Sequence, residues 1–141
     1  MSALDAIAVK VVDEAGAASG NATALLHEAA KLLEAFVQSS TPGTIDLRSL
    51  PLTPGDYDEL REALGAGAVF ARVDAIGPSE LRETRYPGLW WVTHFNDAGE
   101  IVAELIEIGP VPQILVAPMQ DVAAGLSGFK EALVDAIAPK L

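Results

Sequence analysis

No cysteine occurs in this sequence of 141 residues, and histidine occurs only twice. Without cysteine the chain has no disulfide bonds, thiolate metal sites, cysteine-held iron–sulfur clusters or cysteine nucleophiles. His27 and His94 lie far apart and form neither a His-x-His nor an HExxH pattern, whereas metal ligands are expected to cluster. We therefore predict no metal site and no bound cofactor.

Long apolar runs are also lacking, and none approaches the roughly 20 residues that span a membrane. The segment from Met1 to Val12 carries Asp5 and Lys10 inside its apolar pattern, unlike the uninterrupted apolar stretch of a secretory leader. A cysteine-free chain without such a leader is most simply cytoplasmic. The sequence thus predicts a cytoplasmic protein that does not enter a membrane.

Basic residues are scarce, with nine Lys and Arg against twenty Asp and Glu and a net charge of -11. A surface of this sign repels phosphate backbones, so nucleic-acid binding is disfavoured. Every Arg lies between Arg48 and Arg85, and no Lys or Arg occurs from Tyr86 to Phe129. Two interpretations remain open: the acidic stretch is a solvated face with intramolecular pairs, or it is a docking surface for a basic partner segment.

The chain is rich in apolar residues, which make up 50% of the sequence. Disorder is therefore not expected. A length of 141 residues suits one domain, able to bury about 70% of its unfolded surface. We predict a single domain over residues 1–141.

Apolar residues at helical spacing predict two helices in the first third of the chain. One is expected over residues 3–15, and a stronger one begins with Asn21 as its N-cap and runs to about Gln38. The buried face of the second helix comprises Leu25, Ala29, Leu32, Leu33 and Phe36. A short strand is expected next, over residues 44–47.

A capping box predicts the third helix. Thr53 can accept from the backbone at Asp56, Asp56 can reach back to Thr53, and Pro54 suits the first helical position. Tyr57, Leu60 and Leu64 then share one face, and Gly65 or Gly67 ends the helix.

Four strands are expected after this helix. Residues 68–76 and 80–86 flank a Gly77-Pro78 turn, and residues 89–95 and 101–108 flank a loop in which Gly99 suits the left-handed position. The sequence therefore predicts an α+β fold with an antiparallel meander sheet of four to six strands and helices packed on it.

The C-terminal part of the chain is expected to hold a short edge strand and a last helix. The strand is predicted over residues 114–116, and the helix begins at Pro118. Its inner face comprises Phe129, Leu133 and Ile137. Gly125 and Gly128 are expected to divide it, with Ser127 as a second cap.

Catalytic motifs are not evident. No GxSxG elbow is present, Ser79 and the other serines suit turns or caps, and Gly65-Ala66-Gly67 lacks the spacing of a dinucleotide fingerprint. Trp90 and Trp91, as neighbours on a strand, point to opposite faces. Either both are covered within the domain, or one is an anchor for a partner.

The central stretch of the chain resembles a known family. It contains Ile45-Asp46-Leu47-Arg48, Gly77-Pro78, Glu83-Thr84-Arg85-Tyr86-Pro87-Gly88-Leu89-Trp90-Trp91-Val92 and Ile106-Glu107-Ile108. This succession, over roughly residues 25–116, is similar to the conserved region of the HupH/HyaF hydrogenase expression proteins.

The resemblance implies a function in hydrogenase maturation. Family members are implicated as accessory or chaperone-like factors in cytoplasmic maturation of NiFe-hydrogenases, and they are not established enzymes. The implied partner is a hydrogenase subunit precursor or another maturation protein. Many members are longer chains with this region toward their C-terminus, so a homodimer could supply here what the additional half supplies elsewhere.

We predict that partner binding depends on a set of charged and aromatic residues within one meander. These are Arg82, Glu83, Arg85, Trp90 and Trp91. An alternative is a small-ligand or enzymatic domain in which Arg72, Arg82 and Arg85 gather in a pocket to hold a carboxylate or phosphate. A third interpretation is an oligomerisation module without a client.

Overall fold

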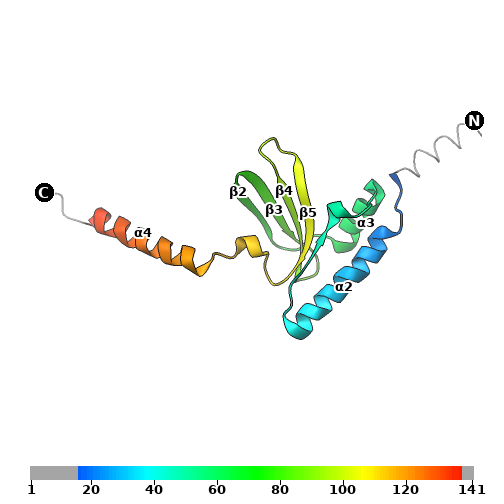
Figure 1. The fold of residues 1–141 in the computed structure, drawn as a ribbon, viewed down its shortest axis with the longest axis horizontal. Coiled ribbons are helices and arrows are strands. Elements are labelled where there is room, and N and C mark those ends of the chain that lie inside the picture. The colour runs from blue at the N-terminus through cyan, green and yellow to red at the C-terminus, as the bar shows by residue number, and fades with distance from the viewer. Residues whose placement is uncertain (1–15, 138–141) are drawn as a thin grey trace, which may run out of the picture.

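Five strands and three α-helices make up the part of the chain that the structure describes, residues 16–137 of a computed structural model. The expected helix over residues 3–15 lies outside this range. The elements are α2 (Asn21–Ser39), β1 (Gly43–Asp46), η1 (Leu47–Ser49), α3 (Pro54–Leu64), β2 (Phe70–Ala75), β3 (Gly77–Glu83), β4 (Leu89–Phe95), β5 (Ile101–Ile108), η2 (Gln113–Leu115) and α4 (Met119–Ile137). Figure 1 shows their arrangement.

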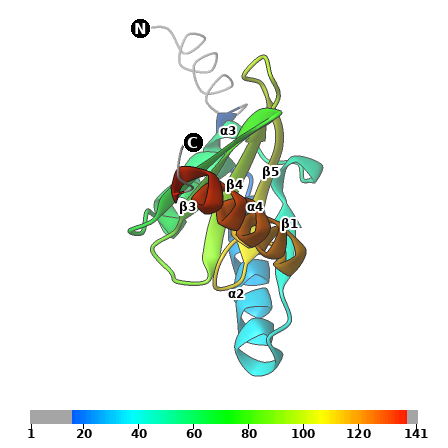
Figure 2. The same ribbon diagram turned by 90° about the vertical axis from the view of Figure 1, so that its left-hand side faces the viewer.

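The strands form one antiparallel sheet in the order β1-β5-β4-β3-β2. Strands β2 to β5 follow one another as a meander, and β1 joins beside β5, so that Figure 2 displays β3, β4, β5 and β1 in that order. The predicted α+β fold is confirmed. The loop between β4 and β5 has the predicted form, with Gly99 at φ 81°.

One face of the sheet carries α2 and α3. The side chains between them form the main core, in which Leu25 and Ala29 of α2 meet Leu60 of α3 and Ile106 of β5. The predicted stripe of α2 is confirmed, since Leu32, Leu33 and Phe36 pack on this core. Burying one such leucine stabilises the fold by roughly 1.5–3 kcal/mol.

The start of α3 follows the predicted capping box. Asp56 N–H donates to Thr53 Oγ1 at 3.1 Å, and Thr53 N–H donates to Asp56 Oδ2 at 2.9 Å. Gly65 ends the helix, as predicted. The predicted cap of α2 is wrong: the N-cap is Gly20 in a left-handed conformation, and the Asn21 amide donates to Pro51 O at 3.0 Å.

The other face of the sheet holds a smaller apolar cluster. Leu81, Trp90 and Val92 are buried there, and Trp90 Nε1 donates to Gly109 O at 3.1 Å. Trp91 instead belongs to the main core, and the exposed fractions of Trp90 and Trp91 are 4% and 8%. Both indoles are thus covered within the domain, on opposite faces, which is the first of the two alternatives.

Two local predictions about strands are wrong. The chain reverses at Ile76, so Gly77 and Pro78 belong to β3 and pair with Ala75 and Asp74 of β2. Gly77 is at φ 76°, which supplies the reversal one residue earlier than expected. Residues 113–115 form a 3-10 helix instead of the edge strand expected at 114–116.

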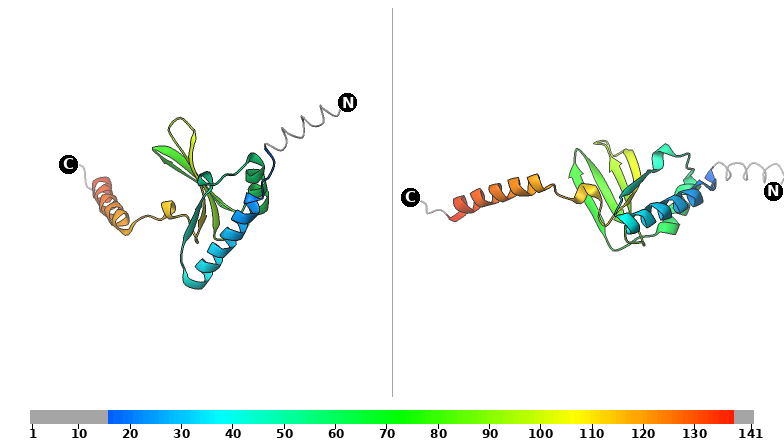
Figure 3. Two further views of the ribbon diagram at one scale, coloured as in Figure 1. Left: turned by 45° about the vertical axis from the view of Figure 1, so that its right-hand side comes forward. Right: turned by 60° about the horizontal axis from the view of Figure 1, so that its bottom comes forward.

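The last helix differs from the prediction in two respects. Helix α4 runs unbroken through Gly125 and Gly128, and none of its residues is buried. Its expected inner face is in solvent, with Phe129 64% exposed. In Figure 1 and both views of Figure 3 the sheet lies between α2 and α4, and α4 leads away from the sheet. Among residues 16–137, no helix has the length and apolar character that crossing a membrane requires.

Candidate functional site

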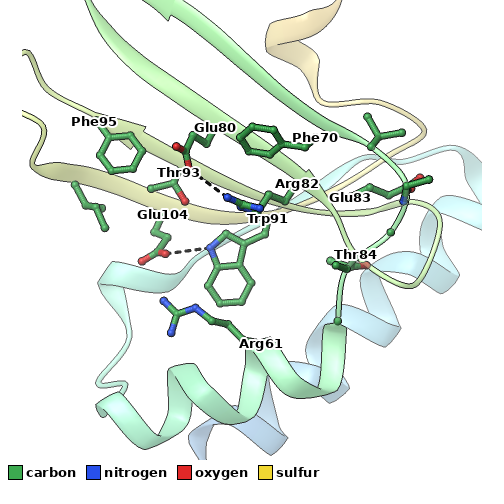
Figure 4. A pocket seen from close by; sticks show the side chains of 16 residues that line it. Arg61, Phe70, Glu80, Arg82, Glu83, Thr84, Trp91, Thr93, Phe95 and Glu104 are labelled. Atoms are coloured by element: carbon green, nitrogen blue, oxygen red, sulfur yellow. Dashed lines mark hydrogen bonds and ion pairs between the residues drawn. The ribbon is translucent and has the colours of Figure 1, made fainter.

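A groove lies on the helix-bearing face of the sheet, beyond the end of α3. Helix α2 packs against β1 and β5, and the side of this face formed by β2 and β3 is left open. A cavity of about 710 Å³ occupies this position. It is lined by α3, the connection from Gly65 to Val69 and strands β2 to β5 (Figure 4).

The floor and walls of the groove are aromatic. The sheet register places Phe70, Arg82 and Trp91 in one row across β2, β3 and β4. The Arg82 guanidinium lies over the Phe70 ring at 4.4 Å, and Arg61 of α3 lies over Trp91 at 5.4 Å. Cations stacked on aromatic faces in this way are attracted by about 0.5–1 kcal/mol when exposed.

A second row across the sheet brings carboxylates into the groove. Glu80 pairs with Thr93, and Thr93 pairs with Glu104, so both acids lie on the groove side. Glu104 is only 7% exposed, and its Oε2 accepts from Trp91 Nε1 at 3.0 Å. Burial, together with the charge of Glu104, raises the pKa of the neighbouring Tyr57 hydroxyl.

The other charged groups of the groove have partners close by. Arg82 lies 3.8 Å from Glu80, and Arg61 lies 3.7 Å from Asp58. Glu83 Oε1 accepts from Ala68 N–H at 2.9 Å and thereby fixes the connection that forms one rim. The groove therefore offers apolar surface, two arginines and three carboxylates within one opening.

Three of the five predicted binding residues line this groove: Arg82, Glu83 and Trp91. The Arg85 guanidinium lies against Gly65 at its edge, and Trp90 is on the opposite face. The gathering of Arg72, Arg82 and Arg85 that would favour the small-ligand alternative is not found, because only Arg82 of the three lines the cavity and Arg72 pairs with Asp74 at 2.8 Å.

Sequence reasoning missed Arg61, Phe70, Glu80 and Glu104. No local signal identified Glu104, because a regular hairpin about the loop at residues 96–100 would set Thr93 opposite Ala103. The register shift at His94/Phe95 brings Glu104 opposite Thr93 instead. Arg61 follows Tyr57 by one helical turn, so it shares the face of α3 that turns toward the sheet.

A Ser–His pair lies outside this groove. Ser79 Oγ and His94 Nδ1 are 2.6 Å apart on adjacent strands, so Ser79 belongs to a strand and not to a turn or cap. Neither residue lines the groove. Among residues 16–137, no group of three or more His, Asp or Glu side chains is placed to hold a metal ion.

Comparison with known proteins places this architecture in a family. The model of the HupH hydrogenase expression protein, C-terminal conserved region, matches residues 20–135. A solved structure, the hydrogenase expression protein HupH from Thiobacillus denitrificans, superposes with a TM-score of 0.81 at 41% identity, covering 84% of this chain and 99% of that one.

Curated relatives agree with this match. The hydrogenase expression/formation protein HoxQ of Azotobacter vinelandii is 32% identical over 97 residues, which are 67% of this chain and 34% of that protein. HupQ of Azotobacter chroococcum is 33% identical over 111 residues, 73% of this chain and 39% of that protein. The chain thus spans little more than a third of the length of these relatives. It belongs to the HupH hydrogenase expression protein family, whose C-terminal conserved region it carries.

Proposed function

We propose that this protein is a non-enzymatic, chaperone-like accessory factor in cytoplasmic maturation of NiFe-hydrogenase, and that it binds an immature subunit or another maturation factor. Family membership supports a role in hydrogenase maturation. The observation that carries the binding step is the open groove with Trp91 at its floor and Arg82 on its wall.

The composition of the groove suits protein recognition. Binding energy at interfaces concentrates in Trp, Tyr and Arg side chains. Here two arginines already lie over aromatic rings before any partner is present, so little side-chain freedom remains to be lost on binding. An open, partly apolar groove favours a segment of a larger partner.

Capture of partners by the tagged full chain tests this function. Cells that express the cognate hydrogenase operon supply the partners, and mass spectrometry identifies them. We expect the wild-type chain to recover a hydrogenase subunit in its immature form or another maturation factor. The Arg82→Ala variant should recover at least about tenfold less of the partner than wild type, the loss typical of an interface hot spot.

Arg72→Ala is the matched control, because Arg72 is an exposed arginine one strand away that does not line the groove. It should recover the same partners as wild type. Recovery of no hydrogenase protein by wild type would contradict the proposed function. Equal losses in both arginine variants would place the binding surface elsewhere.

A small-ligand function is the second candidate, because a cavity of about 710 Å³ lies within the roughly 300–1,000 Å³ that such sites occupy. Arg61 and Arg82 could then hold a carboxylate or phosphate. A rise in the unfolding midpoint with small carboxylates or phosphates, abolished in Arg82→Ala and kept in Arg72→Ala, would favour it.

A further inference from the structure

Glu104 differs from the other charged residues of the groove. Arg61, Arg82 and Glu80 each lie within 4 Å of an opposite charge, and Glu83 accepts a backbone hydrogen bond. Glu104 accepts only from the neutral Trp91 indole, and no Lys, Arg or His among residues 16–137 lies within 4.0 Å of its carboxylate. It is also the most buried of the groove's charged side chains.

A buried carboxylate without a cationic partner lowers the stability of the fold. An ionised group removed from water costs free energy unless a cation or several hydrogen bonds compensate. A single neutral donor at 3.0 Å compensates only in part. Because Glu104 lines the open groove, a cation that enters the groove can reach it. Figure 4 shows its carboxylate beside the Trp91 indole, with Thr93 and Phe95 nearby.

The surroundings of Glu104 suit a long basic side chain. Phe95 and Ile101 line the same part of the groove and can cover an alkyl stem. Glu80 lies on the same face two strands away, opposite Thr93. Arg82 lies 3.8 Å from Glu80, however, so Glu104 is the carboxylate that the charged head would meet. The chain's net charge of -11 further attracts a basic segment.

We infer that the groove recognises an extended segment of a partner protein through an Arg or Lys side chain, which enters beside Trp91 and pairs with Glu104. The inference rests on the proposed function and adds the chemistry of the occupant. The partner supplies the cation that Glu104 lacks, and Arg61 and Arg82 remain stacked on their aromatic rings. Recognition of this kind discriminates by charge, because a neutral side chain leaves Glu104 uncompensated.

Degenerate nine-residue peptides with one fixed central residue provide the test. Pools fixed as Arg, Lys, citrulline or Glu are passed over immobilised full-length protein, and retention is quantified. Citrulline has nearly the shape of Arg without its charge. We expect the Arg and Lys pools to be retained at least about tenfold more than the citrulline and Glu pools, as for a buried charge pair.

Glu104→Gln should abolish this preference. Its amide oxygen can still accept from Trp91 Nε1, so the fold is retained, and unchanged near-ultraviolet circular dichroism would verify this. Asp97→Asn is the matched control, because Asp97 lies on the exposed loop between β4 and β5 and its loss changes the net charge equally. Its preference should equal that of wild type.

Equal retention of the four pools by wild type, or an unchanged preference in Glu104→Gln, would overturn the inference. The partner capture described above is scored separately with the same variants. Recovery of hydrogenase proteins by Glu104→Gln at the wild-type level would overturn the role of Glu104 and leave the proposed function intact. Failure of wild type to recover any would instead count against the proposed function, while the peptide pools still decide the charge preference.

Discussion

Asp56 connects two parts of the chain that are distant in sequence. Besides its bond with Thr53, its carboxylate accepts from Ser19 N–H at 2.7 Å and from Ser19 Oγ at 2.6 Å. These hydrogen bonds, the Ser19 hydroxyl first, lower the pKa of Asp56 from 3.8 to about 2 although burial opposes them. The side chain thus caps α3 and holds the residues before α2 at the same time.

This lowered pKa makes a prediction about acid stability. A carboxyl group whose pKa is lower in the folded state stabilises the fold above its unfolded pKa and loses this contribution as pH falls. For Asp56 the loss runs from about pH 3.8 down through about pH 2. Asp56→Asn should be less stable than wild type at pH 7, with the difference shrinking across that window, as measured by urea unfolding at several pH values.

Asp58→Asn is the control for this effect. Asp58 lies in the same helix but is exposed and pairs only with Arg61 at 3.7 Å, an interaction that contributes little. Its pH dependence should follow wild type. If Asp56→Asn also followed wild type between pH 4 and pH 2, the assigned role of Asp56 would be wrong.

Asp56 and Glu104 differ in how far their roles could be predicted from the sequence. The capping box is encoded within four neighbouring positions, so Thr53 and Asp56 could be predicted directly. The environment of Glu104 depends on the register of β4 and β5 and on where α3 ends. Since those are tertiary facts, the carboxylate looked like any other acid of a solvated face.

At the scale of elements, Gly77, after the turn between β2 and β3, and Gly99, in the loop between β4 and β5, allow the cost of adding a Cβ to be compared. Gly77 and Gly99 both have positive φ, 76° and 81°. A Cβ on Gly77 would collide with the Phe95 carbonyl oxygen, whereas a Cβ on Gly99 would meet nothing within 4 Å. Gly99→Ala should cost about 1–2 kcal/mol for the left-handed backbone alone, and Gly77→Ala clearly more.

Thermal and urea unfolding of the two variants would measure the difference. Equal destabilisation would mean that the turn at Ile76 can move away from β4. Such a movement would disturb the antiparallel pairing of β2 with β3, in which six residue pairs join the two strands.

Whether an element is covered could not be predicted from its pattern. The apolar spacing of α4 correctly predicted a helix, but it also predicted an inner face against the sheet, and that face is exposed. Amphipathicity indicates that a face can be buried and does not say by what. By contrast, the meander was predicted correctly because the loop at residues 96–100, with Gly99 in its left-handed position, is a local signal.

At the scale of the whole molecule, we expect the sheet with α2 and α3 to fold independently of α4. No residue of α4 is buried. A chain ending at Pro118 should therefore keep the unfolding midpoint of the sheet within about 2 °C while its helical circular dichroism falls. A decrease of about 5 °C or more, equivalent to roughly 1 kcal/mol in a domain of this size, would show that α4 packs on the sheet.

The same comparison addresses the proposed homodimer. Light scattering of the full chain and of the shortened chain at micromolar concentration gives their masses. A dimer that becomes a monomer without α4 would assign the exposed apolar side chains of α4 to self-association. A monomeric full chain would remove the homodimer from consideration.

The adjacent indoles of β4 have a consequence for how the chain avoids misfolding. If β4 slipped by one residue against its neighbours, Trp90 would take the place of Trp91, and an indole would still fill each cluster. The size of the side chains therefore does not by itself exclude this one-residue slip at the centre of the sheet. Asn96 Oδ1 holds the reversal between β4 and β5 by accepting from Ala98 and Glu100 N–H, both at 2.9 Å. The register shifts by one residue at His94/Phe95, between this loop and the indoles. Fidelity of pairing in the centre of the sheet therefore also depends on the hydrogen bonds that the indoles donate, Trp90 to Gly109 O and Trp91 to Glu104 Oε2.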